Sequence, residues 1–137
     1  MSESSRQPWL RAMLIVGVVY AFVGIVFAMP ASHVEVWRLA AWVVSAVAYG
    51  AHISYERFRL RNAPRLAALH VALAVALGAF GLAVGANIHS LSVGSANEHR
   101  RLLLLALGLW PIITALPEFL VALVAGWVLG LARPQAK

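Results

Sequence analysis

The sequence has no cysteine and little charge, and these two deficits exclude several classes of protein. Without cysteine there are no disulfides, no thiol catalysis, no thiolate metal sites and no iron–sulfur clusters. Charged residues make up only 12% of the 137 residues, whereas 62% are hydrophobic, and the mean hydropathy is +0.83. A water-soluble domain of this length carries more charge than this. We therefore expect lipid to surround most of the chain.

Motifs of the common enzymes and nucleotide-binding proteins are also missing. The sequence contains no GxGxxG, Walker, GxSxG or HExxH motif, and no nucleophile with a base at a recognisable spacing. We therefore expect no catalytic residue and no enzyme activity. The net charge of +6 could point to nucleic acid, but the basic residues lie at the ends of apolar runs, where membrane topology accounts for them. No nucleic-acid partner is expected.

Four apolar runs fill nearly the whole chain. About 20 apolar residues are enough for a helix to cross a hydrocarbon core of about 30 Å, and the runs predict spans at about residues 9–29, 35–55, 64–89 and 98–132. The predicted fold is all-α: a polytopic membrane protein whose single domain, residues 1–137, is an antiparallel bundle of four transmembrane helices. The first run lacks a small-residue cleavage site, so we expect a retained span rather than a signal peptide.

Basic residues near the span ends predict the orientation. If the N-terminus is cytoplasmic, eight of the eleven Lys and Arg residues lie on the cytoplasmic side, where the excess is normally found. We therefore expect an integral protein of a bacterial inner membrane with both termini in the cytoplasm. Four arginines behind span two could bind anionic lipid headgroups, each contributing about 1 kcal/mol, although topology alone accounts for them: Arg57, Arg59, Arg61 and Arg65.

Small residues and a short repeat suggest how the spans pack. Gly17, Ala21, Gly24 and Ala28 in span one, and Gly81 and Gly85 in span three, have the spacing of closely packed membrane helices. The segments SHVEVWRL and SANEHRRL, which open spans two and four, share Ser, Glu, Arg and Leu in register. Each contains the S-x-x-E pattern of a capping box. The two hairpins are related by duplication, or the two helices have independently good N-terminal caps.

Glu118 is the one acidic residue deep inside an apolar run. A charged side chain there costs roughly 2.5 to 3.5 kcal/mol on insertion scales and usually faces protein or water. The residues that follow it at four-residue intervals are Ala122, Gly126 and Gly130. This small stripe predicts that Glu118 points into a helix interface, either as a proton or cation carrier or as a protonated, hydrogen-bonded interface carboxyl.

Two prolines precede this acid in the same apolar run. Pro111 and Pro117 each leave a carbonyl of the preceding turn without its backbone donor. In a membrane such carbonyls need other partners, and Thr114, water or a neighbouring helix could supply them. Glu118, Thr114 and Pro117 are therefore the candidate ion, proton or interface residues.

The histidines form two groups by predicted depth. His52 and His70 should lie near the cytoplasmic surface, where two imidazoles could bind haem iron or another metal, or simply form hydrogen bonds with neighbours. His33, His89 and His99 should lie near the outer surface, where they could bind a divalent metal or be solvated. No cofactor is favoured, and haem is the one considered.

The leading expectation is a small non-enzymatic membrane protein. It would be a self-assembling pore or transport unit, or a subunit of a larger membrane complex, with Glu118 in a helix interface. The alternatives are a membrane redox protein that holds haem or a related tetrapyrrole through His52 and His70, and a purely structural membrane partner. The expected partners are the lipid bilayer and either further copies of the chain or other membrane subunits.

Overall fold

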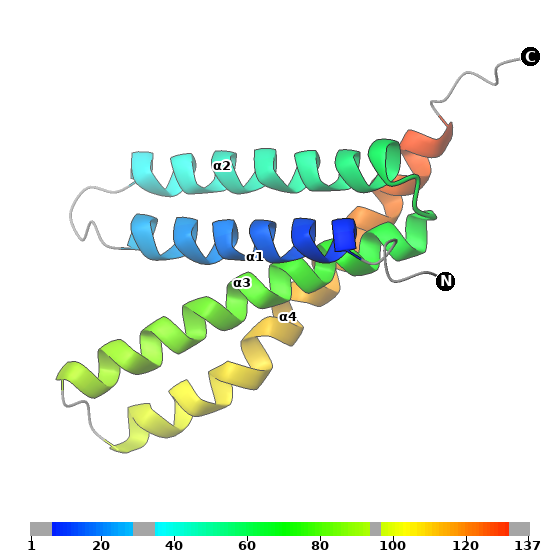
Figure 1. Ribbon diagram of the computed structural model, residues 1–137. Coiled ribbons are helices and arrows are strands. Elements are labelled where there is room, and N and C mark those ends of the chain that lie inside the picture. Colours follow the sequence, from blue (N-terminus) through cyan, green and yellow to red (C-terminus); the bar gives the residue numbers. More distant parts are fainter. Residues whose placement is uncertain (1–6, 29–34, 94–96, 132–137) are drawn as a thin grey trace, which may run out of the picture.

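The computed structural model describes residues 7–28, 35–93 and 97–131, and in these ranges the protein is helical apart from a short connection (Figure 1). Four helices are long and apolar enough to cross a membrane. The prediction of an all-helical fold with four such helices is therefore confirmed. The helices are α1 (Gln7–Ala28), α2 (Glu35–Ser54, continued by a π-helical turn, Tyr55–Arg59), α3 (Pro64–Val93) and α4 (Asn97–Leu131).

The helices form two antiparallel hairpins, α1–α2 and α3–α4 (Figure 1). Helix α1 begins and α4 ends at the end of the bundle that also holds the α2–α3 connection, which we call the terminal end; the opposite end is the loop end. The hairpins diverge towards the loop end (Figure 1). Helices α2 and α4 both begin there, as the two related segments predicted, whereas the capping serines Ser32 and Ser95 lie outside the described residues.

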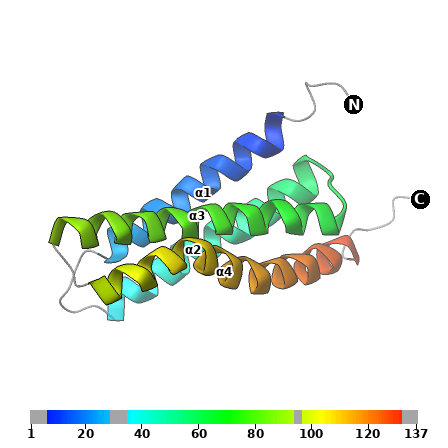
Figure 2. The same ribbon diagram turned by 90° about the horizontal axis from the view of Figure 1, so that it is seen from below.

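Helix α3 is the centre of the bundle. In the most apolar stretch of α3, 50% of the residues are buried, compared with 11 or 12% in the corresponding stretches of the other three helices. It lies beside both α1 and α4 in the two views (Figures 1 and 2). The alanine-rich stretch of α3 allows this, because small side chains let neighbouring backbones approach closely.

Glycines make the close crossing of α1 and α3 possible. A Cβ added at Gly78 would lie 2.5 Å from Cβ of Tyr20, and one added at Gly81 would lie 2.9 Å from Cβ of Ala21. The predicted contact through small residues is therefore confirmed for Ala21 and Gly81. Gly85, in contrast, has nothing within 4 Å of an added Cβ and takes no part in the crossing.

Helix α4 runs through both of its prolines without ending. The Thr114 hydroxyl donates to the carbonyls of Trp110 (2.9 Å) and Pro111 (3.1 Å). These bonds stay within the preceding turn and do not reach the carbonyl of Ile113, which Pro117 leaves without its backbone donor. Thr114 therefore does not bind the carbonyl that Pro117 leaves unpaired, although the sequence had suggested it as a possible donor.

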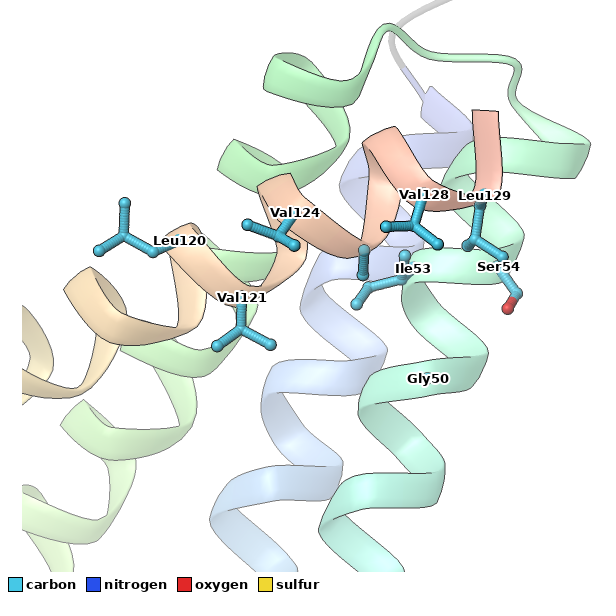
Figure 3. Close-up of a pocket in the computed structure, with 9 residues that line it drawn as sticks. Gly50, Ile53, Ser54, Leu120, Val121, Val124, Val128 and Leu129 are labelled. Atoms are coloured by element: carbon cyan, nitrogen blue, oxygen red, sulfur yellow. The ribbon is translucent and has the colours of Figure 1, made fainter. Parts of the chain in front are cut away.

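Helix α2 is attached to the rest of the bundle near the terminal end. Ile53 joins a buried apolar cluster with Ala68, Val71 and Ala122, and it points towards α4 where the two helices cross (Figure 3). Towards the loop end α2 becomes exposed, and Trp42 has 75% of its surface uncovered. The half of α2 nearest the loop end therefore has few packing constraints.

Candidate functional site

A partly open cavity of about 460 Å³ lies between the two hairpins, and all four helices contribute to its wall. We call it the central cavity. Most of the wall is apolar, with the two indole rings of Trp42 and Trp110 among the larger groups. The polar groups of the wall come from three helices: Tyr20 of α1, Ser45 and Tyr49 of α2, and Thr114 and Glu118 of α4.

Glu118 is half-buried in this wall, close to two tyrosines. The Tyr49 hydroxyl donates to the backbone carbonyl of Glu118 and so ties α2 to α4. Tyr20 and Tyr49 both lie within electrostatic range of the Glu118 carboxyl group. The Tyr20 hydroxyl is buried and has no hydrogen-bond partner, which costs free energy. The wall of the cavity therefore contains one acid and four residues that carry hydroxyl groups.

The small residues that follow Glu118 on α4 make contacts at the terminal end. Ala122 is part of the buried apolar cluster. A Cβ added at Gly126 would lie 3.4 Å from Cβ of Pro64. A Cβ added at Gly130 would lie 2.8 Å from Nη2 of Arg57. The stripe thus faces the α2–α3 connection, and Glu118 is the member of this series that lines the central cavity.

A second hollow, about 610 Å³ in volume, lies between α2 and α4 on a different part of the surface. Figure 3 shows Leu120, Val121, Val124, Val128 and Leu129 of α4 above Gly50, Ile53 and Ser54 of α2. Ser54 is its single polar lining residue. Such a wall offers apolar contact but no group that could select a ligand by charge, so the central cavity is the better candidate site.

A buried polar group at the terminal end was not predicted. We call His52, Glu56, Asn62 and His70 the Glu56 cluster. Glu56 is 0% exposed, and His52 and His70 are 3% and 5% exposed. Asn62 Nδ2 donates to Glu56 Oε2 at 2.6 Å, and His70 Nδ1 lies 3.0 Å from the same oxygen. His52 Nε2 lies 3.8 Å from Glu56 Oε1, which is beyond hydrogen-bond distance.

The backbone after α2 positions this cluster. In the π-helical turn Tyr55–Arg59, Leu60 N–H donates to the Tyr55 carbonyl, and Asn62 N–H donates to the Glu56 carbonyl, both at 3.1 Å. Arg61 has φ of 55°, in the left-handed region that reverses a chain after a helix. The chain therefore folds back at once, which brings the Asn62 side chain onto Glu56.

Stacking on α1 completes the cluster. The indole of Trp9 lies on the imidazole of His70, with ring centroids 4.3 Å apart and an interplanar angle of 8°. This contact leaves one face of His70 against an aromatic ring while its Nδ1 edge meets Glu56. The cluster thus joins α1, α2, the connection and α3.

The sequence contained a signal for this cluster. Ser45, Tyr49, His52 and Glu56 are spaced by four, three and four residues, which places them on one face of a helix. Glu56 continues this face to the point where the basic residues behind span two begin. A polar face of this length on an apolar helix predicts burial against protein.

The two histidines considered for haem lie on opposite oxygens of the Glu56 carboxyl group. Glu56 occupies Nδ1 of His70, whereas both ring nitrogens of His52 have no hydrogen-bond partner; the haem hypothesis stays a prediction. Within the described ranges, no three His, Cys, Asp or Glu side chains are arranged to hold a metal ion. Of the histidines predicted near the outer surface, His89 is exposed on α3, whereas His33 and the side chain of His99 lie outside the described residues.

The four arginines behind span two do not behave alike. Arg57 is half-buried: its Nε donates to the carbonyl of Gly126 at 3.2 Å and its Nη1 to the carbonyl of Asn62 at 3.1 Å. Arg59, Arg61 and Arg65 are exposed and remain candidates for contact with lipid headgroups. Arg57 instead binds the α2–α3 connection and α4 together.

The chain matches no protein-family model, no curated protein sequence and no solved structure. Its function is therefore inferred from the central cavity and the polar groups around it.

Proposed function

We propose that this chain is an integral membrane transport protein, with both termini in the cytoplasm of a bacterium, that carries small and mainly apolar cations in its central cavity. The observation that supports this proposal most strongly is the position of Glu118 in the wall of a cavity to which all four helices contribute. Ionisable residues inside membrane proteins commonly mark a substrate or ion route.

The chemistry of the wall favours a cation with an apolar body. A carboxylate attracts positive charge strongly where water is scarce. The indoles of Trp42 and Trp110 can hold a cation through their ring faces. A volume of about 460 Å³ is typical of sites for small organic molecules, which lie in the range of roughly 300 to 1,000 Å³. Glu118 would be neutralised either by the substrate or by a proton, so the two should compete.

Tight packing at the terminal end supports a carrier rather than an open pore. Ile53, Ala68, Val71 and Ala122 are all buried and lie between the central cavity and the terminal end. A cluster of buried apolar side chains offers water no hydrogen-bond partner along this route. Transport would then require α2 to change its position against α3 and α4, for which the exposed half of α2 provides freedom.

We further propose that the chain functions as a homo-oligomer or together with other membrane subunits. The glycines of α1 are used inside one copy, so an assembly would use the exposed apolar faces of α2 and α4 instead. The mass of the particle in lipid nanodiscs tests this. A particle that holds a single chain and nothing else would contradict it.

Binding and flux of one probe cation test the transport proposal. Ethidium added to the protein in nanodiscs should quench tryptophan fluorescence, because Trp42 and Trp110 line the cavity. Glu118→Gln should weaken this binding at least tenfold and abolish ethidium movement driven by a pH gradient across liposomes. The matched control is Glu35→Gln, which makes the same change at an exposed position where α2 begins. Equal binding and flux in wild type and Glu118→Gln would refute the proposal.

A further inference from the structure

The Glu56 cluster holds an acid and two histidines that protein covers almost completely. Transport through the central cavity does not by itself require it. Its carboxyl group has one oxygen with two partners and one with none. Oε2 is close to Asn62 Nδ2 and His70 Nδ1. Oε1 is buried without a hydrogen-bond partner, as are both ring nitrogens of His52. Unpaired buried polar atoms are rare in folded proteins and need an explanation.

A proton on His52 would supply a charged partner for the unpaired oxygen of Glu56. A carboxylate beside two neutral imidazoles carries one negative charge, and burying a charge is costly unless it is well paired. A proton taken up by His52 turns both of its ring nitrogens into donors and gives an imidazolium opposite Oε1. The distance of 3.8 Å between His52 Nε2 and Glu56 Oε1 would then shorten to about 2.7 to 2.9 Å, the usual length of a charged N–H···O bond.

We propose that His52, Glu56 and His70 form a proton-binding site, and that the bound proton sets how α2 packs against α3 and α4 beside the central cavity. Proton exchange occurs with water at the terminal end, and the proton resides on His52 at Oε1 or between His70 and Oε2. The coupling to substrate movement rests on the proposed transport function, whereas proton binding does not.

The position of the cluster in the fold connects it to the cavity. Glu56 belongs to the turn that continues α2, and His70 belongs to α3, so their contact lies at the attached end of α2. Tyr49 is one turn before His52 on the same face of α2, and its hydroxyl binds the carbonyl of Glu118. A shift of α2 at the cluster therefore changes the contact between α2 and the acid of the cavity.

The surrounding charges are compatible with a site for a single proton. On α1, Arg11 lines a groove together with His52 and Tyr55. Arg57, next to Glu56, directs its guanidinium to the backbone carbonyls of Asn62 and Gly126. Helix α4 approaches this end through small residues without ionisable side chains. Histidine is then the group that changes charge near neutral pH.

Distance measurement as a function of pH tests the proposal. Because the chain has no cysteine, Val43→Cys on α2 and Leu109→Cys on α4, both at exposed positions, can carry a single pair of spin labels. The distance distribution between the labels should shift between about pH 5 and pH 8. Glu56→Gln and His52→Gln should each abolish the shift. His89→Gln, which removes an exposed imidazole of α3, should leave it unchanged.

Two further results separate the outcomes. If the shift persists in both cluster variants, the proton-binding site is refuted, whatever the flux measurements show. If wild type shows the shift but carries no ethidium, the transport proposal fails and the proton site stands. Should the cluster variants not fold, the ring-nitrogen NMR signals of His52 and His70 in wild type decide: at least one must titrate between about pH 5 and pH 8, and two invariant rings would refute the site.

Discussion

Replacing Gly78 by alanine should destabilise the bundle by forcing α1 away from α3. The new Cβ would lie 2.5 Å from Cβ of Tyr20 and 3.3 Å from the carbonyl oxygen of Gly17. Neither of these atoms is the far end of a flexible side chain, so rotation of a side chain cannot relieve the contact. The backbones of α1 and α3 must separate, and the well-packed crossing between them is lost.

The expected size of this effect follows from a comparison with Gly85→Ala. Both positions lie inside α3, so any gain in helix propensity from alanine, roughly 0.5 to 1 kcal/mol, is shared. At Gly85 nothing lies within 4 Å of the added Cβ. The two variants therefore differ by the cost of overpacking alone, which is typically about 1 to 3 kcal/mol, with Gly78→Ala the less stable.

The assay is unfolding in mixed micelles with a rising fraction of sodium dodecyl sulfate, followed by circular dichroism and tryptophan fluorescence. The free energy of unfolding should be lower for Gly78→Ala than for Gly85→Ala by the amount given above. Two variants of equal stability would show that α1 and α3 do not cross at Gly78, and the position of Tyr20 in the cavity wall would then be wrong as well.

Two other predictions concern the terminal end of the bundle. Gly130→Ala would place a Cβ 2.8 Å from Nη2 of Arg57. Because a long side chain can move aside, the free energy of unfolding in the same assay should fall by less than about 1.5 kcal/mol, the value of one hydrogen bond. A larger fall would show that Arg57 is fixed. The purified protein should be colourless, because His52 and His70 are both buried and Nδ1 of His70 is bound to Glu56. A Soret band that disappears in His52→Ala and His70→Ala would instead support haem binding.

The helices could be predicted from the sequence because each depends on a local property. A run of about 20 apolar residues defines a membrane-length helix without any knowledge of its neighbours. Predicted and observed ends agree closely: α1 occupies Gln7–Ala28 where residues 9–29 were expected, and α4 occupies Asn97–Leu131 where 98–132 were expected. The spacing of small residues indicated close packing of spans one and three, but their pairing with each other, and the absence of Gly85 from the crossing, came from the structure.

The arrangement of polar groups could be predicted only in part. Glu118 stood out because it is alone in an apolar run, but its tyrosine neighbours come from α1 and α2 and follow from packing. Glu56 was missed because its burial depends on a π-helical turn and on His70, 14 residues away in sequence. The mean hydropathy of a long segment hides a single buried acid. The regular spacing of the polar residues on one face of α2 would have revealed it.

The weak attachment of the half of α2 nearest the loop end could not be predicted either. The mean hydropathy of an apolar run does not distinguish a helix packed against protein from one packed against lipid, since both surroundings are apolar. Trp42 and Ile53 lie on the same helix, yet one is 75% exposed and the other 5%. Only the tertiary contacts separate them.

The most direct test of the central cavity compares the reactivity of two introduced cysteines on α4. Thr114 lines the cavity, whereas Leu116 is 62% exposed on the outside of the bundle. A thiol reacts as its thiolate, which needs water or a polar surrounding. In liposomes, Thr114→Cys should therefore react with a water-soluble cationic methanethiosulfonate at least ten times faster than Leu116→Cys, and ethidium should slow that reaction. Equal rates, or faster reaction at position 116, would contradict a cavity beside Glu118 that water and cations can enter.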